Sequence, residues 1–425
     1  MKRNSAIIWK ESRVIPWLFS LSWEQREFGE SFDLLTNNTL SRAELNDENG
    51  TALNVHYGDI LVKFGEMIDL AADHLPYITD PAKVIKSAAL QNGDVIIADT
   101  AEDSTVGKCS EITGIIDKIV VSGLHTIPCR PRQKFAPGYL GYFMNSPAYH
   151  DQLLPLMQGT KVTSVSKSAL EDTLLCYPTD SDEQALIGRY FMNLDNLITL
   201  HQRKYAKLMN IKKSMLDKMF PKDGATVPEI RFAGFTDAWE QRKLDDILVQ
   251  RVEHQTISPD APLLAFSYAE GVINPEDKKS NKRDFIMTDK FNKVFSRTEL
   301  NDIIYNPANV IHGAIHRNKL GTGVVSPIYK IFVCNNVSAK YMGERLHTDR
   351  FIQEITKYIE GTVVKLRTLS PEMFLDMTIE VPPSYEEQER IGEFFEALDN
   401  LITLHQRELE RLQNIKKSCL EKMFV

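Results

Sequence analysis

The chain has 425 residues, of which 43% are hydrophobic and 25% charged. That balance is typical of folded proteins and excludes a wholly disordered chain, and the length predicts two or three domains. The formal net charge of -8 argues against a protein that coats nucleic acid non-specifically. The five cysteines are scattered without a Cys-x-x-Cys pair, and apolar runs are too short to span a bilayer, which together predict a cytoplasmic protein with no membrane segment.

In chain order, the pattern predicts globular parts that alternate with helices. Each globular part opens with the same four residues, at Trp23–Arg26 and at Trp239–Arg242, and closes with an apolar stretch, at Leu170–Tyr177 and at Phe374–Val381, which we read as a last strand. The predicted organisation is an irregular segment at 1–22, to which we assign no function, a globular domain at 23–180, a helix at 181–222, a linker at 223–238, a second globular domain at 239–384 and a second helix at 385–425.

The two predicted helices are copies of one another. Residues Gln184–Phe220 and Gln388–Phe424 are offset by 204 positions and are identical at 24 of 37 of them, including the ten consecutive residues Leu194–Arg203 and Leu398–Arg407. The globular parts have diverged almost everywhere else. This contrast predicts a duplicated unit whose helices share one duty while the globular parts have different duties.

Apolar residues in both helices follow a spacing of four and three, which is the pattern of a coiled-coil seam. A single amphipathic helix cannot bury its stripe alone, so we expect the two helices to pack on each other, antiparallel and related by a pseudo-twofold axis. For the packing of the spacer helices and their contacts with partner subunits, which we call the helical interface, we predict Leu194, Leu197, Ile198, His201, Leu208, Leu398, Leu401, Ile402, His405 and Leu412. The two seam histidines fit a polar pair that fixes the register, or alternatively a pH switch or metal pair.

Motifs for catalysis are missing from the sequence. There is no phosphate-binding loop for ATP, and Asn306-Pro307-Ala308 lacks the second proline and the aromatic residue of an adenine methyltransferase motif. His312 and His316 lack the acid or cysteine that would complete a zinc site. A loose nuclease pattern starts from Asp260 and Glu276 but has no counterpart in the first half. We therefore expect no catalytic residues, no metal and no cofactor bound by this chain.

The repeated helices, the paired Trp-Glu-Gln-Arg openings and the Gly-Thr segments before each last strand resemble the specificity (S) subunits of type I restriction–modification systems. The resemblance implies an α+β fold with two mixed α/β target-recognition domains, separated by two long antiparallel, coiled-coil-like helices. It implies that each domain reads one half of a bipartite asymmetric site in double-stranded DNA, and that the helices fix the spacing and bind two methylation (M) subunits. S-adenosylmethionine, ATP and Mg would belong to the M subunits and the restriction (R) subunits, so that this chain is the non-catalytic part of an adenine methyltransferase and ATP-dependent endonuclease complex.

Residues that contact DNA need exposed basic or hydrogen-bonding side chains on loops. The segments that follow each Gly-Thr pair are the strongest candidates, because both halves keep a basic loop there. The predicted DNA-contact residues are Lys108, His125, Arg130, Arg132, Lys161, Ser164, Lys167, Lys282, Arg283, Arg317, Lys319, Lys365 and Arg367. Two alternatives to the S-subunit hypothesis stay open: a free-standing or inhibitory relative that binds M subunits without supporting restriction, and a nuclease.

Overall fold

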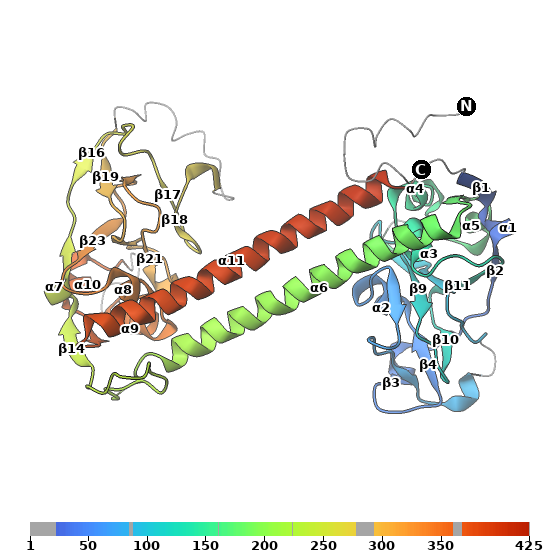
Figure 1. The fold of residues 1–425 in the computed structure, drawn as a ribbon, viewed down its shortest axis with the longest axis horizontal. Helices are drawn as coiled ribbons and strands as arrows, with labels where there is room; N and C mark the ends of the chain where they lie inside the picture. The colour runs from blue at the N-terminus through green and yellow to red at the C-terminus, as the bar shows by residue number, and fades with distance from the viewer. Residues whose placement is uncertain are drawn as a thin grey trace. The chain divides into compact units, whose positions relative to one another are not determined.

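The computed structural model describes residues 23–84, 88–159, 161–222, 224–277, 293–359 and 368–424 (Figure 1). The chain divides into two compact units. Unit 1 comprises residues 1–201 with 408–425, and unit 2 comprises residues 202–407. The division falls inside both long helices, so each unit combines one globular domain, the start of the helix that follows it and the end of the other helix.

The globular domain of unit 1 is built on a five-stranded sheet of order β2-β11-β7-β9-β5 and a four-stranded sheet of order β10-β4-β6-β3. Its strands are β1 (Trp23–Glu27), β2 (Phe32–Leu34), β3 (Leu45–Asn46), β4 (Ala52–Val55), β5 (Met67–Asp69), β6 (Tyr77–Ile78), β7 (Val95–Ala98), β8 (Thr100–Ala101), β9 (Cys109–Thr113), β10 (Ile119–Ser122), β11 (Thr126–Pro131), β12 (Thr163–Ser164) and β13 (Leu174–Pro178). Its short helices are α1 (Phe28–Ser31), α2 (Tyr57–Val62), α3 (Tyr139–Met144), α4 (Pro147–His150) and α5 (Lys167–Glu171).

The globular domain of unit 2 contains a four-stranded sheet of order β15-β23-β20-β21 and a three-stranded sheet of order β16-β19-β22. Its strands are β14 (Glu240–Lys243), β15 (Leu248–Gln250), β16 (His254–Gln255), β17 (Ala265–Ser267), β18 (Gly271–Ile273), β19 (Phe295–Thr298), β20 (Ile303–Tyr305), β21 (Ile315–Arg317), β22 (Gly323–Val325), β23 (Lys330–Cys334) and β24 (Thr378–Val381). Its short helices are α7 (Leu244–Ile247), α8 (Ala339–Arg345), α9 (Asp349–Ile359) and α10 (Pro371–Asp376).

Each domain is closed by pairing its first strand with its last. Strand β1 is antiparallel to β13, with Gln25 opposite Cys176, and β14 is antiparallel to β24, with Gln241 opposite Glu380. The repeated Trp-Glu-Gln-Arg openings are therefore strands that bring the two ends of each domain together. This places the entrance to each long helix beside the start of its own domain.

The prediction of a single strand at Leu170–Tyr177 and at Phe374–Val381 is wrong in its first half. Short helices, α5 and α10, occupy the beginning of each stretch, and the strands β13 and β24 follow. The cause is a serine at the N-cap of each short helix: Ser166 Oγ accepts a hydrogen bond from the backbone N–H of Ala169, and Ser370 Oγ from that of Met373. Such caps satisfy orphan donors at a helix start.

The two long helices match the predicted repeat. Helix α6 spans Ser181–Lys218 and α11 spans Tyr385–Lys422, so both ends keep the offset of 204 residues. Gly188 and Gly392 are the only helix-breaking residues inside them. The seam residues Phe191, Leu194 and Ile198 are buried in unit 1, as the apolar spacing predicts. Within the described residues, no helix combines the length and apolar character needed to cross a bilayer.

Candidate functional site

The start of each long helix is fixed to its own globular domain by a repeated glutamine. Gln184 donates from Nε2 to the carbonyl of Pro178 (2.8 Å), and its Oε1 accepts from the backbone N–H of Ala136 (3.1 Å). Gln388 makes the same two bonds, to the carbonyl of Pro382 and from the backbone N–H of Ser338, each 2.8 Å long. Both glutamines are buried. The repeat has therefore kept a contact that holds helix against domain.

A repeated glycine lets each helix approach its domain closely. A Cβ at Gly188 would lie 2.7 Å from the carbonyl oxygen of Pro137, and a Cβ at Gly392 would lie 2.3 Å from the Cβ of Lys340. Neither distance accommodates a side chain. The two positions are equivalent in the repeat, so close packing requires glycine at both. Glycine is kept there although it is less favourable than alanine inside a helix.

The end of each helix packs against the start of the other one. In unit 1, the ring of Phe424 stacks on Phe191 of α6, with centroids 5.8 Å apart, and contacts Tyr139 of α3. In unit 2, the ring of Phe220 stacks on Phe395 of α11 at 6.0 Å and contacts Tyr341 of α8. Within each unit the helices are therefore antiparallel, as the pseudo-twofold repeat predicts.

A lysine on one helix also reaches an aspartate on the other. In unit 1, Lys416 lies 2.7 Å from Asp195 and 2.8 Å from Glu66 of the globular domain. Burial tends to lower the pKa of Lys416, but these two carboxylates outweigh it and raise that pKa. In unit 2, the equivalent Lys212 lies 2.5 Å from the equivalent Asp399. Each pair joins two helices through a partly buried charge contact.

The predicted helical-interface residues separate into three sets by exposure. Leu194, Ile198, Leu398, Ile402 and Leu412 are buried, whereas His201, Leu208 and His405 are half-buried. Leu197 and Leu401 differ from these, because their side chains are 45% and 44% exposed. Beside them, Leu200 and Leu404 are 45% and 59% exposed. The seam thus uses the first set, and the leucines at 197, 200, 401 and 404 present apolar side chains to solvent.

In unit 1, the structure brings together three of the predicted DNA-contact residues. Ser164 of β12 pairs with Thr100 of β8, and the His125 ring lies 3.3 Å from Asp99 and 3.4 Å from the Thr100 hydroxyl. Lys161 is exposed and precedes Ser164 in the same turn. Among the described residues, neither Lys161 nor Ser164 makes a side-chain hydrogen bond or ion pair.

Aromatic side chains border this group, and sequence reasoning missed them. The Tyr57 ring contacts His125 edge-on, with centroids 5.3 Å apart, and lies 4.7 Å from the His56 ring. His56 and Tyr57 are 68 residues or more before His125 in the sequence, so no local spacing could reveal the contact. We call His56, Tyr57, Thr100, His125, Lys161 and Ser164 the β8 group. Lys167 is exposed and begins α5, three residues after Ser164.

Three other predicted residues of unit 1 already have partners in the fold. Arg130 forms two bonds to the buried carboxylate of Asp94 (2.9 and 2.7 Å). Arg132 pairs with Asp33 at 2.9 Å. Lys108 donates to the carbonyls of Leu61 and Phe64 at the end of α2 (3.1 and 2.9 Å). Since β11 spans Thr126–Pro131, at about 3.3 Å per residue Arg132 lies roughly 20 Å from His125 along the strand.

In unit 2, the two predicted residues within the described ranges hold the start of α11. Arg317 is buried and donates to Glu396 of α11 (2.8 Å) and to Asn301 (2.7 Å). Lys319 pairs with Asp399 of the same helix at 3.1 Å. Both side chains therefore join domain to helix. The other predictions for this domain, Lys282, Arg283, Lys365 and Arg367, lie outside the described residues.

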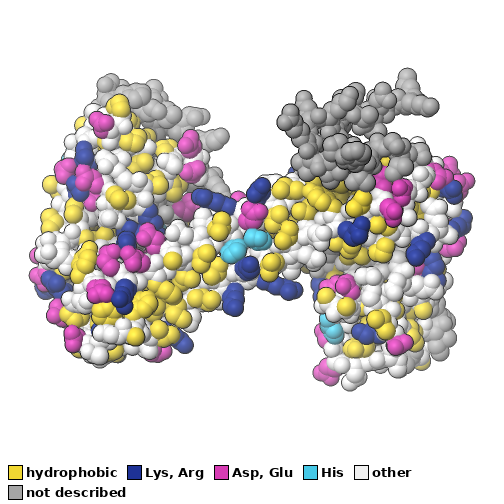
Figure 2. Space-filling view, viewed as in Figure 1, with side chains coloured by type: hydrophobic (Ala, Val, Ile, Leu, Met, Phe, Trp, Pro, Cys, Tyr) yellow, Lys and Arg dark blue, Asp and Glu magenta, His cyan; other side chains and the backbone are white. Residues whose placement is uncertain are grey.

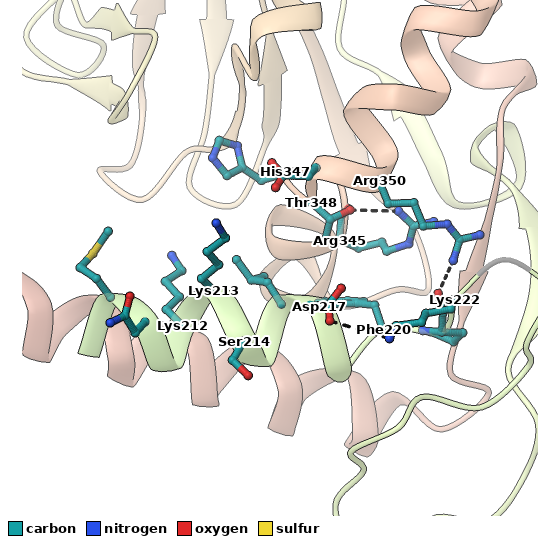
Figure 3. A pocket seen from close by; sticks show the side chains of 15 residues that line it. Lys212, Lys213, Ser214, Asp217, Phe220, Lys222, Arg345, His347, Thr348 and Arg350 are labelled. Atoms are coloured by element: carbon teal, nitrogen blue, oxygen red, sulfur yellow. Dashed lines mark hydrogen bonds and ion pairs between the residues drawn. The ribbon is translucent and has the colours of Figure 1, made fainter. Parts of the chain in front are cut away.

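A cavity of about 700 Å³ opens between the end of α6 and the segment joining α8 to α9 (Figure 3). Its lining is basic, with Lys212, Arg345 and Arg350 among the residues that face it. These cations are paired: Arg345 with Glu380 (2.8 Å), Arg350 with Glu354 (3.0 Å) and Lys212 with Asp399. The cavity thus lies where the end of α6 packs on the second domain, and nearby carboxylates neutralise these three cations.

Charges of both signs are interspersed over the faces of the units that Figure 2 shows. Asp260 and Glu276, the start of the loose nuclease pattern, are both exposed. Among the described residues, His, Cys, Asp and Glu form no group of three or more that would hold a metal ion. His312 and His316 are not joined by a third ligand; instead His316 bonds to the carbonyl of Tyr268 (2.9 Å), and its ring lies 4.6 Å from that of His347. Burial lowers the pKa of His316 to about 4.

Comparison with known proteins finds similarity to specificity subunits of type I restriction–modification systems. A family model described as the type I restriction modification DNA specificity domain matches residues 348–414. The type I restriction enzyme MjaVIII specificity subunit of Methanocaldococcus jannaschii is 22% identical over 62% of this chain, and the match spans less than two thirds (64%) of that relative. The putative MjaX specificity subunit of the same organism is 21% identical over 94% of this chain and 92% of its own length.

The fold is similar to that of a solved S subunit. The crystal structure of a type I restriction-modification system S subunit from M. genitalium superposes with a TM-score of 0.60, at 13% identity, over 96% of this chain and 97% of that one. The fold of this chain, with two globular domains that each continue into a copy of one long helix, is therefore similar to the fold of that S subunit. In sequence, the chain is similar to the specificity subunits of type I restriction–modification systems.

Proposed function

We propose that this chain is the DNA sequence-specificity subunit of a type I restriction–modification complex, in which each globular domain reads one half of a bipartite asymmetric site. The proposal rests on one contrast: the two halves of the chain share the contacts of their long helices but not the sequences of their globular domains. Contacts at Gln184, Gly188 and Phe220 recur at positions 388, 392 and 424, whereas the domains share little sequence. Different domains on equivalent supports suit two different half-sites.

The helices would fix the separation of the half-sites and bind two M subunits. A helix of 38 residues is about 57 Å long at 1.5 Å per residue, against about 34–36 Å for one turn of DNA. Leu197, Leu200, Leu401 and Leu404 supply exposed apolar surface at equivalent positions of the two helices. Exposed leucines on a helix suit a protein partner better than a phosphate backbone. We also propose that the two target-recognition domains comprise residues 23–180 and 239–384.

For DNA contact in the first domain, we propose the β8 group with Lys167. Lys161 and Lys167 offer charge to phosphates, while Ser164 and His125 offer hydrogen-bonding groups to base edges. The ring of Tyr57 supplies an apolar face beside them. In the second domain, Lys365 and Arg367 follow the equivalent Gly-Thr pair in the sequence and remain candidates, as do Lys282 and Arg283.

Similarity to specificity subunits supports assembly with other subunits and with DNA. We propose that methyl transfer from S-adenosylmethionine is performed by M subunits, and ATP-driven cleavage by R subunits, in the cytoplasm. This chain would then choose the site without catalysing a reaction. The buried carboxylates of Asp94 and Asp302 form ion pairs with Arg130 and Arg251.

The test is reconstitution with an M subunit encoded beside this chain. The purified pair should methylate adenine in DNA that contains one split sequence, and neither protein should do so alone. Specific methylation without this chain would contradict the proposal. Cleavage by this chain alone that requires a metal and is lost in Asp260→Ala would support a nuclease instead. A pair that assembles but blocks methylation would identify an inhibitory relative.

A further inference from the structure

The backbone of His125 is fixed at the end of the five-stranded sheet of unit 1. Strands β7 and β11 pair antiparallel up to Ala98 opposite Thr126, and the same register places Asp99 opposite His125. The backbone N–H of Asp99 donates to the carbonyl of His125 (3.1 Å), and the Asp99 carbonyl accepts from the N–H of Val165 (2.9 Å). His125 has a φ of 54°, which a residue other than glycine keeps only where the surrounding structure holds it. The imidazole therefore projects from a rigid support.

The neighbours of the His125 ring decide which of its nitrogens carries the proton. Nδ1 lies 3.3 Å from Oδ1 of Asp99 and 3.4 Å from Oγ1 of Thr100. The Thr100 hydroxyl donates its own proton to the same Asp99 oxygen (2.7 Å), so both neighbours of Nδ1 can only accept. Nδ1 therefore carries the proton, and in the neutral ring Nε2 is a hydrogen-bond acceptor.

Nε2 is the nitrogen of His125 that is left for a ligand. The side chain is 46% exposed, and within the described residues its hydrogen-bonding and ionic contacts are made through Nδ1. The ring of Tyr57 packs edge-on against His125 and borders it on one side. The neighbouring His56 has the opposite arrangement, because its Nδ1 accepts from the backbone N–H of Gly58 (3.2 Å) and its proton in the neutral ring is on Nε2. The two histidines of the β8 group thus differ in which nitrogen can accept.

We propose that Nε2 of His125 accepts a hydrogen bond from the exocyclic amino group of one base in the major groove, N6 of adenine or N4 of cytosine. Asp99 is the positioning residue that keeps Nε2 an acceptor. Those amino groups are the donors that bases present in the major groove, whereas N7, O6 and O4 are acceptors. A guanine or thymine at the same place would set two acceptors against each other and leave both without a partner. This inference rests on the proposed function and names the chemical group by which the β8 group selects a base.

Nitrogen NMR of the full chain with isotope-labelled histidine tests the position of the proton without DNA. At pH 8 the His125 ring, assigned by the signal that His125→Gln removes, should carry its proton on Nδ1, and His56 should carry its own on Nε2. In Asp99→Asn the amide N–H can donate to Nδ1, so the proton of His125 should move to Nε2. Asp47→Asn, which alters an exposed His–Asp contact, is the matched control and should leave His125 unchanged. A proton on Nε2 of His125 in the wild-type chain, or an unmoved proton in Asp99→Asn, would overturn the proposal.

Base analogues test the contact itself in the complex of this chain with M subunits. Each adenine and cytosine of the half-site read by the first domain is replaced in turn by an analogue that lacks only the exocyclic amino group. Binding by the wild-type complex should weaken by about 3–10-fold at one position through the loss of one neutral hydrogen bond, and His125→Ala should abolish that difference. Asp99→Asn should abolish it too, whereas a merely structural role of Asp99 would weaken binding to all of these DNAs equally. The position that responds identifies the base as adenine or cytosine.

The failure of this inference is distinguishable from the failure of the proposed function. If the complex binds a split site and no removal of an amino group depends on His125, the base contact is wrong and the proposed function stands. If the complex recognises no split site, the proposed function is wrong and the base contact falls with it.

Discussion

At the scale of single residues, burial and existing ion pairs within the fold separate the basic residues that we propose for DNA contact from those that we do not. Arg130, Arg132 and Lys108 have partners within the fold, and Arg317 is buried against α11. Lys161, Ser164 and Lys167 are exposed. Sequence spacing does not distinguish these two classes, because a counter-ion such as Asp94 lies 36 residues from Arg130. The exposed set is therefore where substitution should affect DNA binding without affecting folding.

Lys161→Ala should weaken DNA binding and lower the salt dependence of the binding constant by about one unit of slope, since one phosphate contact releases about one counterion. The measurement is fluorescence anisotropy of the assembled complex with DNA over a series of salt concentrations. Lys118→Ala, which removes an exposed lysine elsewhere on the domain, should keep the original slope. An unaltered slope for Lys161→Ala would remove that residue from the DNA interface.

Glu111 should make the stability of the first domain depend on pH. Burial raises the pKa of Glu111 from its ordinary 4.5 to about 7, although the backbone N–H groups of Gly138 and Gly141 donate to it. The native carboxyl then binds a proton that the unfolded chain has released, so the free energy of unfolding falls as pH rises from about 4.5 to 7, by ~3 kcal/mol at most.

Urea unfolding at pH 5 and pH 8 measures this dependence. Glu111→Gln should reduce the difference between the two pH values, because glutamine does not titrate. Glu102→Gln, at an exposed position, should leave the difference as it is. A wild-type chain that is more stable at pH 8 than at pH 5, with Glu111→Gln showing the same difference, would contradict the assignment.

At the scale of elements, the repeat preserves contacts and not merely helix-forming residues. Gln184, Gly188, Phe191, Asp195 and Lys212 each have an identical copy 204 residues later that makes the equivalent contact. Helix propensity alone would have allowed many substitutions at these positions. Their retention means that each helix start is matched to a domain and each helix end to the other helix.

Gly188→Ala and Gly392→Ala should each destabilise the chain by about 1–3 kcal/mol, because the added Cβ would overlap Pro137 or Lys340. An exposed helical glycine would show the opposite sign, since alanine favours helix. Chemical denaturation followed by circular dichroism measures the change. Gly65→Ala, where a Cβ meets nothing within 4 Å, is the control and should be close to neutral. A gain in stability at 188 and 392 would contradict the close packing.

Leu197→Asp with Leu401→Asp should abolish co-purification with M subunits while the chain stays folded. Both side chains are exposed, so the charge is solvated in the free chain but would be buried in the complex. Leu194→Asp is the contrast, because Leu194 is 7% exposed and its substitution should unfold unit 1. Gln202→Asp, on an exposed polar position, should preserve assembly. Retained assembly of the double variant would exclude these leucines from the interface.

The helices were the most predictable elements because their signal is local and duplicated. Helix α6 begins at Ser181 and α11 at Tyr385, the first residues of the predicted helical segments 181–222 and 385–425. The stretches at Leu170 and Phe374 were mistaken for strands throughout, because apolar runs hide a serine-capped turn. The β8 group was predictable only in part, since its members come from distant loops.

At the scale of the whole molecule, the net charge of -8 and the interspersed surface charges in Figure 2 fit a chain that selects DNA through a few exposed side chains. Much of the electrostatic attraction to phosphates would then come from the partner subunits. Because the domains are joined to equivalent helix starts, exchange of one domain should alter one half-site and leave the other. This is the central claim of the proposed function.

Sequencing of methylated bases in strains with and without this chain tests that claim most directly. With the chain present, methyladenine should occur in one split and asymmetric motif, and the motif should disappear when the gene is deleted. Replacing residues 239–384 with the equivalent domain of another specificity subunit should change one half of the motif and keep the other half and its spacing. An unchanged methylation pattern on deletion, or a change in both halves on exchange, would contradict the account.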